Sequence, residues 1–335
     1  AQGTAQEMTA VANAEAETVQ KDGEPVQEDG QLELSASASQ LAVEPVAKQE
    51  VQQRAADCAS AFVSNGCCIV RDVLSEAQCS LLSAFVDAQL LEARRFVEDS
   101  GLDEATYVGE LFGKLRCRQS RWDVKLPMEG SVSEAMACLG SSLGSFLAEL
   151  LGADALLTEL SCIVSDPGAP QQPLHSDSRS HEPGMLSVLV ALQDVTRAMG
   201  PTVLCPKTHC LAGSNLLSRV KPHCEEARSL LRGYQDEAIE SLRGVHAACQ
   251  VGTAVVYDSR LIHCGGANLS ELEGGARRRM LVATFAMPRK VPRGSACTIR
   301  RDLMGRFRLR SFLAKPGESE SGANSKDAHA PTHRT

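Results

Sequence analysis

The feature that most constrains the fold is a series of short apolar segments, separated by turn residues, that begins near residue 155. In order, the segments are ALLTELSCIVSD, QPLHSD, MLSVLVALQDV, TVLCP, HAACQ, GTAVVYDS, LIHCG and RRMLVATFAM. Short segments rich in β-branched residues and bounded by Gly, Pro, Asn, Asp or Ser are typical of strands. Several such strands after a helical start favour a β-sandwich or a jelly-roll barrel with helices packed outside. The sequence therefore predicts an α+β fold.

The part of the chain before these strands has helical periodicity. A first helix is expected to end near Asn65, and a second to begin at Ser75, a residue type that caps helix N-termini. The apolar face of the second helix consists of Leu81, Leu82, Phe85 and Val86. Residues 131–152 predict a third helix, broken near Gly140, and residues 224–244 predict a helix inserted between strands.

Composition divides the chain into one folded domain and two polar ends. Residues 1–52 are rich in Ala, Gln, Glu and Ser without an aromatic residue, so we expect a disordered acidic leader. Residues 313–335 are again polar and predict a disordered tail. Between them, residues 53–312 form a single domain, with a helical N-terminal part over 53–152 and a barrel core over 153–290.

Charge and composition exclude several classes of partner. The formal net charge is −8, aromatic residues make up 4% and no basic stripe is evident, which argues against nucleic acid as a partner. No apolar run approaches the length of a membrane span, so no membrane partner is expected. Thirteen scattered cysteines without a CxxC pair favour an intracellular protein with reduced thiols. We expect a monomer, cytoplasmic by default, although the chain begins with Ala and an organelle remains open.

Three residues in the strand region have the types that bind iron. His175 and Asp177 are two apart, so on a strand both side chains leave the same face. His263 follows in an apolar strand further along the chain. Two imidazoles and one carboxylate form a facial triad for Fe(II) and leave three coordination positions open. The alternative is a polar pair on a solvated strand.

Three consecutive arginines begin the last strand of the series. Arg277 and Arg279 share one face of this strand and Arg278 takes the other. An arginine directed into the barrel is suited to pair with both oxygens of a dicarboxylic acid bound to the metal. The alternation of side chains along a strand does not say which of the three arginines points inward. At least one of them must be a solvated arginine at the strand end.

In five places, and in the same order, the chain resembles the phytanoyl-CoA dioxygenase family of Fe(II)- and 2-oxoglutarate-dependent oxygenases. The matching elements are FVSNGCCIVRDVLSEAQCSLL, LHSD, VALQDVTRAMGPTVLCPKTH, DSRLIHCGGANLS and RRRMLVATFA. The resemblance extends over most of the folded chain. It implies a double-stranded β-helix, the cupin-like form of the jelly roll.

Carried over by position, the resemblance implies that His175, Asp177 and His263 are the iron ligands and catalytic residues. It implies that Arg278 binds 2-oxoglutarate, with Arg279 as the second candidate because a one-residue slip exchanges the faces of a strand.

In the same way, the extended segment LRCRQSRWDVKLPM corresponds to a region that holds 2-oxoglutarate or substrate. Arg121 and Lys125 lie on one face of it and are candidates to contact an anion, and Gln172 is a further residue expected at the pocket.

The implied function is hydroxylation of a small organic substrate with decarboxylation of 2-oxoglutarate to succinate, using Fe(2+), 2-oxoglutarate and O2. Asp177 favours hydroxylation over halogenation, because a halogenase has a small residue where the carboxylate ligand stands. Two alternatives remain for the site: a non-catalytic metal-binding protein of the same fold, and a zinc hydrolase with the same three ligands. A third alternative is a scaffold whose acidic leader recruits partners.

Overall fold

The computed structural model describes residues 42–43, 59–104, 107–115, 117–178, 183–211, 244–288 and 298–313. The helices are α2 (Glu76–Asp99) and α3 (Gly130–Leu151), with a further helical stretch at 59–65 and short 3-10 turns η2 (Thr208–Leu211), η3 (Glu271–Glu273), η4 (Arg301–Leu303) and η5 (Leu309–Ser311). The strands are β1 (Ala42–Val43), β2 (Cys67–Val70), β3 (Arg121–Lys125), β4 (Leu156–Ser165), β5 (Met185–Ala191), β6 (Thr202–Cys205), β7 (Val245–His246), β8 (Ala254–Asp258), β9 (Ile262–Gly265) and β10 (Arg278–Ala286).

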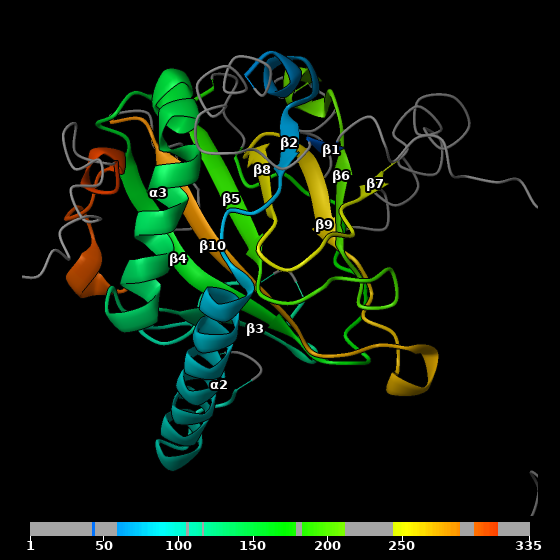
Figure 1. Cartoon of the computed structure of the whole chain (residues 1–335). Coiled ribbons are helices and arrows are strands. Elements are labelled where there is room, and N and C mark those ends of the chain that lie inside the picture. The colour runs from blue at the N-terminus through cyan, green and yellow to red at the C-terminus, as the bar shows by residue number, and fades with distance from the viewer. Residues whose placement is uncertain are drawn as a thin grey trace, which may run out of the picture. The chain divides into compact units, whose positions relative to one another are not determined.

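Two sheets form the core of the domain (Figure 1). The large sheet has seven strands in the order β1-β2-β8-β5-β10-β4-β3, antiparallel except between β1 and β2. The small sheet has three strands in the order β7-β6-β9. The predicted α+β, double-stranded β-helix class is confirmed. One correction applies: within the described residues, the two sheets are not hydrogen-bonded into a closed barrel.

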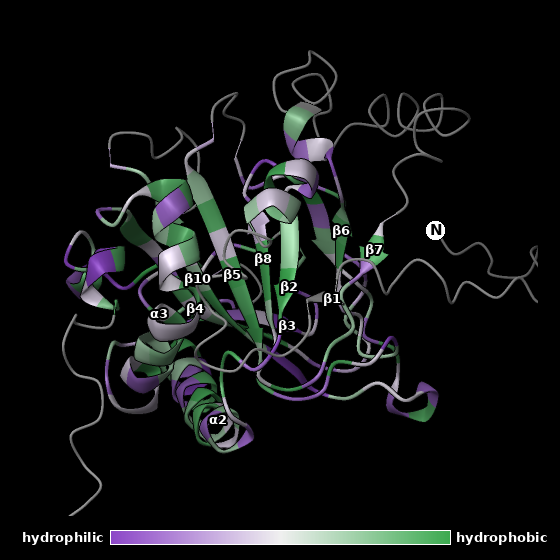
Figure 2. Cartoon of the chain, turned by 45° about the horizontal axis from the view of Figure 1, so that its top comes forward, coloured by the Kyte–Doolittle hydropathy of each residue, from purple (hydrophilic) through white to green (hydrophobic). Residues whose placement is uncertain are grey.

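Both faces of the large sheet are apolar, and each of them is covered, one by α2 and α3 and the other by the small sheet. Along β10, Leu281, Ala283 and Phe285 belong to one core cluster, shared with α2 and α3, while Met280 and Val282 belong to a second cluster, shared with the small sheet. Successive side chains of a strand leave opposite faces, which explains this alternation. Figure 2 shows the resulting hydrophobic strands between the helices and the small sheet. A sheet covered on both faces is a suitable wall for a buried site.

Helix α3 follows the predicted third helix but is continuous at Gly140, so the expected break is wrong. A Cβ at Gly140 would lie 2.0 Å from the carbonyl oxygen of Phe312. The glycine therefore allows the C-terminal segment to pack against the helix, and does not interrupt it.

Most of the predicted strands are present, with one exception that matters for the site. Residues 172–177 form no strand; a bridge between His175 and His263 and hydrogen bonds between Gln172 and Gly265 join them to β9. The predicted helix at 224–244 lies outside the described residues. The predicted disordered leader stays a prediction, because only Ala42 and Val43 of it are described. The predicted tail also stays a prediction, because the residues beyond Leu313 are not described. In the part of the chain that is described, no helix combines the length and apolarity needed to cross a bilayer.

Helix α2 begins where the sequence predicts, at the Ser75 cap. The Gln78 N–H donates to Ser75 Oγ (3.3 Å) and the Ser75 N–H donates to Gln78 Oε1 (2.9 Å), which completes a capping box. We expect Ser75→Ala to lower the free energy of unfolding by about 1 kcal/mol, because one helix N–H loses its acceptor. Urea denaturation measures this. The matched control is Ser80→Ala, at an exposed position inside α2, which should not destabilise the protein.

Candidate active site

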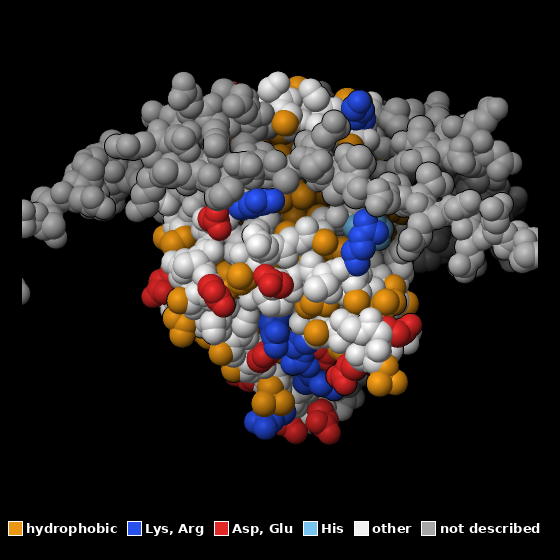
Figure 3. All heavy atoms as spheres, turned by 45° about the vertical axis from the view of Figure 1, so that its right-hand side comes forward, with side chains coloured by type: hydrophobic (Ala, Val, Ile, Leu, Met, Phe, Trp, Pro, Cys, Tyr) orange, Lys and Arg blue, Asp and Glu red, His pale blue; other side chains and the backbone are white. Residues whose placement is uncertain are grey.

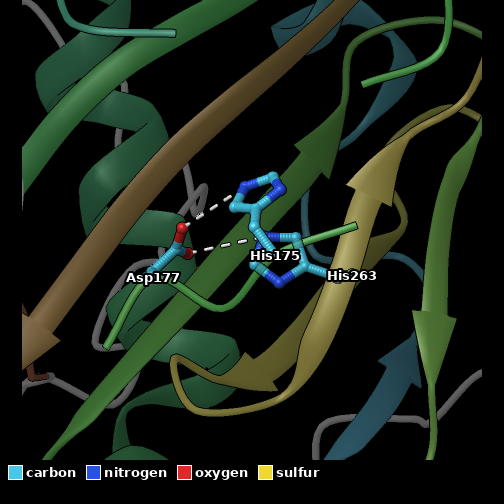
Figure 4. Close-up of side chains that lie close together, drawn as sticks. All are labelled: His175, Asp177 and His263. Atoms are coloured by element: carbon cyan, nitrogen blue, oxygen red, sulfur yellow. Dashed lines mark ion pairs between the residues drawn. The ribbon is translucent and has the colours of Figure 1, made fainter. Parts of the chain in front are cut away.

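Three side chains chosen from the sequence converge between the two sheets (Figure 4). His263 lies on β9, and His175 and Asp177 lie in the segment before β5. The His175 N–H donates to the His263 carbonyl (2.9 Å) and the His263 N–H donates to the His175 carbonyl (2.8 Å). This bridge sets the two imidazoles beside each other, with ring centroids 4.6 Å apart.

The carboxylate of Asp177 faces both histidines. Oδ1 lies 3.7 Å from His175 Nε2, and Oδ2 lies 3.5 Å from His263 Nε2. One nitrogen or oxygen from each of the three residues lies within 4.8 Å of the other two. Ligand atoms about 2 Å from a common metal ion lie within such distances of one another. The donor set and spacing therefore fit a metal ion.

Backbone carbonyls set the orientation of both rings. His175 Nδ1 lies 2.8 Å from the Pro173 carbonyl, and His263 Nδ1 lies 3.0 Å from the Leu261 carbonyl. A carbonyl only accepts hydrogen bonds, so each Nδ1 carries the proton. Both Nε2 lone pairs then point toward Asp177, and this is the tautomer in which Nε2 can bind a metal ion.

Tyr257 on β8 holds the third ligand in place. Its hydroxyl donates to Asp177 Oδ2 at 3.3 Å, and its ring centroid lies 4.5 Å from that of His263. Burial raises the pKa of the Tyr257 hydroxyl well above its ordinary value, and the charge of Asp177 adds to this shift. The phenol therefore stays protonated and remains a donor to the carboxylate.

The three residues open on a cavity of about 450 Å³. Strand β10 lines it with alternate residues, Arg278, Met280, Val282 and Thr284. Gln172 also lines it, as the sequence predicts, and its Oε1 accepts a hydrogen bond from the Gly265 N–H (2.8 Å).

Arg278 is a buried cation, and no carboxylate of the described residues pairs with it. It is 2% exposed, and its Nη2 donates a hydrogen bond to Ser165 Oγ at 3.3 Å. Among the described residues, Nε and Nη1 have no hydrogen-bond partner. Burial lowers the pKa of the guanidinium to about 9, with a further contribution from the charge of Arg121. A buried charge of this kind requires a partner, and the partner must be anionic.

Arg121 and Arg278 lie on either side of Ser165 in the sheet, and both donate to its hydroxyl. Arg121 is 1% exposed, and it donates from Nε to Ser165 Oγ (2.9 Å) and from Nη2 to the carbonyls of Pro170 (3.0 Å) and Gly266 (3.1 Å). It therefore fixes the loops around Arg278 and adds positive charge there, but it is not part of the cavity lining.

The other arginines and the lysine chosen from the sequence lie outside the cavity. Arg279 forms a two-pronged ion pair with Asp87 of α2 (2.9 and 2.6 Å), and Arg277 forms one with Asp166 (2.6 and 2.8 Å). Lys125 lies on the same face of β3 as Arg121 but does not line the cavity. Charged side chains of both signs are interspersed on the face drawn in Figure 3.

Sequence reasoning missed two acids in the cavity, Asp123 on β3 and Glu159 on β4. Asp123 lies between Arg121 and Lys125, on the face already assigned to the site. Glu159 is the one charged residue in the otherwise apolar and hydroxyl-bearing strand β4. A lone charge in a buried strand is the signal that could have identified it.

Comparison with known proteins agrees with the fold and the family. The family model described as phytanoyl-CoA dioxygenase (PhyH) matches residues 62–279. A search of curated proteins gives no significant match.

Among solved structures, the non-heme alpha-ketoglutarate-dependent carbocyclase SnoK from nogalamycin biosynthesis is 16% identical, with a TM-score of 0.50 over 73% of this chain and 87% of that one. The epimerase SnoN from the same biosynthesis is 17% identical, with a TM-score of 0.49 over 70% and 84%. AviO1 from Streptomyces viridochromogenes is 21% identical, with a TM-score of 0.47 over 71% and 96%.

At 16% identity SnoK bears on the fold alone, the other two structures carry no argument at TM-scores below 0.5, and the family model carries the assignment. Its match covers more than half of the 335 residues and includes both histidines, the aspartate and Arg278. The chain therefore belongs to the phytanoyl-CoA dioxygenase family of Fe(II)- and 2-oxoglutarate-dependent enzymes.

Proposed function

We propose that the protein is an Fe(II)- and 2-oxoglutarate-dependent dioxygenase that hydroxylates a small organic molecule. One observation carries this proposal: a His-Asp-His cluster and a buried arginine without an anionic partner open on the same cavity. The cluster fits a divalent metal ion, and the arginine fits the distal carboxylate of 2-oxoglutarate.

In this proposal each residue of the site has a defined role. His175, Asp177 and His263 hold the metal from one side and leave its other positions open. Tyr257 keeps the Asp177 carboxylate in place through its hydrogen bond to Oδ2. Arg278 forms a two-pronged pair with the distal carboxylate of 2-oxoglutarate, and Gln172 lies beside it. When bound, iron and 2-oxoglutarate supply the oxidising chemistry, in which O2 is consumed and 2-oxoglutarate is converted to succinate and CO2.

The apolar part of the lining keeps water away from the site. Leu189, Met280 and Val282 line the cavity between the metal ligands and the far end of β10. A dry wall protects a reactive oxidant from quenching and strengthens the charge pairing at Arg278. Hydroxylation is favoured over halogenation because Asp177 provides a carboxylate where a halide would need an open position.

Succinate formation tests the proposal directly. Protein reconstituted anaerobically with Fe(II), given 2-oxoglutarate and then O2, is expected to produce succinate, and a chelator is expected to stop the production. Screening a metabolite extract by mass spectrometry for a gain of one oxygen atom then identifies the substrate. A sample that binds iron but forms no succinate would indicate the non-catalytic alternative. Hydrolysis supported by Zn(II), again without succinate, would indicate the hydrolase.

A further inference from the structure

The cavity has a cationic end and an acidic end. Arg278 and Thr284 both line it from β10 and are six residues apart, which corresponds to roughly 20 Å along a strand. The acidic end lies at Thr284, whose hydroxyl donates to Glu159 Oε2 at 2.6 Å. Asp123 also lines the cavity, from the adjacent edge strand β3, where it pairs in register with Ile163, four residues along β4 from Glu159. The two carboxylates interact, because the charge of Asp123 contributes to the raised pKa of Glu159. The metal ligands and the 2-oxoglutarate arginine use neither acid.

One carboxylate oxygen of Asp123, Oδ1, is buried and has no hydrogen-bond partner among the described residues. The residue as a whole is only 3% exposed. A Cβ at Gly113 would clash with the other oxygen, Oδ2, so the chain is closely packed on that side. A buried carboxylate oxygen without a donor is costly to the folded protein. A donor supplied by a bound molecule would remove this cost.

The charge at the acidic end is also not balanced. Burial raises the pKa of Asp123 to about 6, and the opposing effects of its hydrogen bonds and of Lys125 and Arg118 are smaller. Burial raises the pKa of Glu159 well above its ordinary value, and the negative charge of Asp123 adds to the shift. Among the described lining residues the cations are Arg278, six residues along β10 from the Thr284 that pairs with Glu159, and the exposed Lys114.

We propose that Glu159 and Asp123 form the substrate-recognition end of the cavity, and that the substrate presents a protonated nitrogen, an ammonium or a guanidinium group, to them. The inference rests on the proposed function, since it assigns the opposite end to 2-oxoglutarate. A cation supplies the donors that Asp123 Oδ1 lacks and neutralises the acid pair. Charge-assisted hydrogen bonds of this kind are among the strongest polar contacts in proteins. The two ends of the cavity then bind ligands of opposite charge.

A row of hydroxyl groups connects the acidic end to the metal ligands. Glu159, Thr284, Ser187 and Tyr257 occupy adjacent strands in register. Thr284 Oγ1 lies 3.0 Å from Ser187 Oγ, and Tyr257 donates to Asp177. Three strand spacings separate Glu159 from Tyr257, or about 14 Å between backbones. The basic nitrogen of the substrate therefore lies several bonds from the carbon that faces the metal.

Binding of three matched probes tests the substrate class without turnover. Hexylamine, 1-hexanol and hexanoate share a six-carbon chain and differ in charge. Calorimetry on the full chain, loaded anaerobically with Fe(II) and 2-oxoglutarate, is expected to show that hexylammonium binds about ten-fold or more tightly than hexanol, with hexanoate weakest. Glu159→Gln, which keeps the side-chain shape, is expected to remove most of this preference. Asp123→Asn is the second variant, and the exposed Glu149→Gln on α3 is the control that should leave it unchanged.

Three results would overturn the proposal: absence of hexylammonium binding, equal or tighter binding of hexanol or hexanoate, or a preference that survives both Glu159→Gln and Asp123→Asn. Binding of 2-oxoglutarate, measured in the same samples, separates this failure from failure of the proposed function. If 2-oxoglutarate binds and the ammonium preference is absent, only the substrate class is wrong. If iron and 2-oxoglutarate do not bind, the proposed function is wrong, and the charge preference at the acidic end is still measured in the metal-free protein.

Discussion

Asp177→Ala is expected to lower succinate formation by about a thousand-fold or more, because it removes the one carboxylate that faces both histidines. The same substitution should remove the stabilisation that metal provides. A metal ion at a hundred-fold excess over its dissociation constant stabilises a folded protein by about 2.7 kcal/mol, and this increment should disappear in the variant. Thermal unfolding with and without Fe(II), under anaerobic conditions, measures it together with turnover.

The metal-free Asp177→Ala protein should be nearly as stable as the unsubstituted one. The Asp177 side chain is 35% exposed and accepts a long hydrogen bond (3.3 Å) from Tyr257, so little folding energy depends on it. Asp99→Ala, at the exposed end of α2, is the matched control and should keep both the metal increment and the turnover. Retention of metal stabilisation by Asp177→Ala would show that the ion binds elsewhere.

The structure brings together the three residues that the sequence singles out as metal ligands, although part of the reasoning is wrong. His175 and Asp177 were expected to share a face because they lie two apart on a strand. Within the described residues, their segment forms no strand, and the bridge to His263 together with hydrogen bonds of Gln172 and Ser178 fixes it. The two side chains converge because that bridge and the Pro173 carbonyl orient His175, while Tyr257 holds Asp177. These are long-range contacts, which residue spacing does not contain.

The choice among the three arginines shows a limit of pattern reasoning on a sheet that is covered on both faces. Side chains on both faces of β10 are apolar and buried, so hydrophobic alternation does not say which face lines the cavity. Arg277 and Arg279 are paired with carboxylates of other segments, Asp166 and Asp87. Only tertiary contacts supply these anions and leave Arg278 without one.

The acidic end of the cavity was missed for a related reason. Asp123 stands among charged residues in RWDVK, a pattern that also suits a solvated strand. Its burial depends on neighbours that are distant in sequence, such as Thr298, which lines the same cavity. Glu159 could have been identified more easily from the sequence, because it is the one charged residue of β4.

Arg278→Met is expected to have opposite effects on ligand binding and on stability. Loss of a two-pronged, charge-assisted contact in a dry site costs about 2–5 kcal/mol, so the dissociation constant of 2-oxoglutarate should rise between about 30-fold and several thousand-fold. The metal-free, ligand-free protein should become more stable by about 1 kcal/mol or more, because a buried guanidinium that has no anionic partner among the described residues is replaced by a shorter, unbranched apolar chain. Calorimetric titration of 2-oxoglutarate and urea unfolding measure the two effects.

Arg279→Met is the matched control, since it makes the same chemical change one residue away. Arg279 pairs with Asp87 and its side chain is 17% exposed, so its loss should cost up to about 1 kcal/mol of stability. The dissociation constant of 2-oxoglutarate should not change. A change in stability that has opposite signs in the two variants therefore distinguishes a ligand-binding arginine from a structural one. If Arg279→Met weakens 2-oxoglutarate binding and Arg278→Met does not, the assignment of the two arginines must be exchanged, which would require β10 to present its opposite face to the cavity.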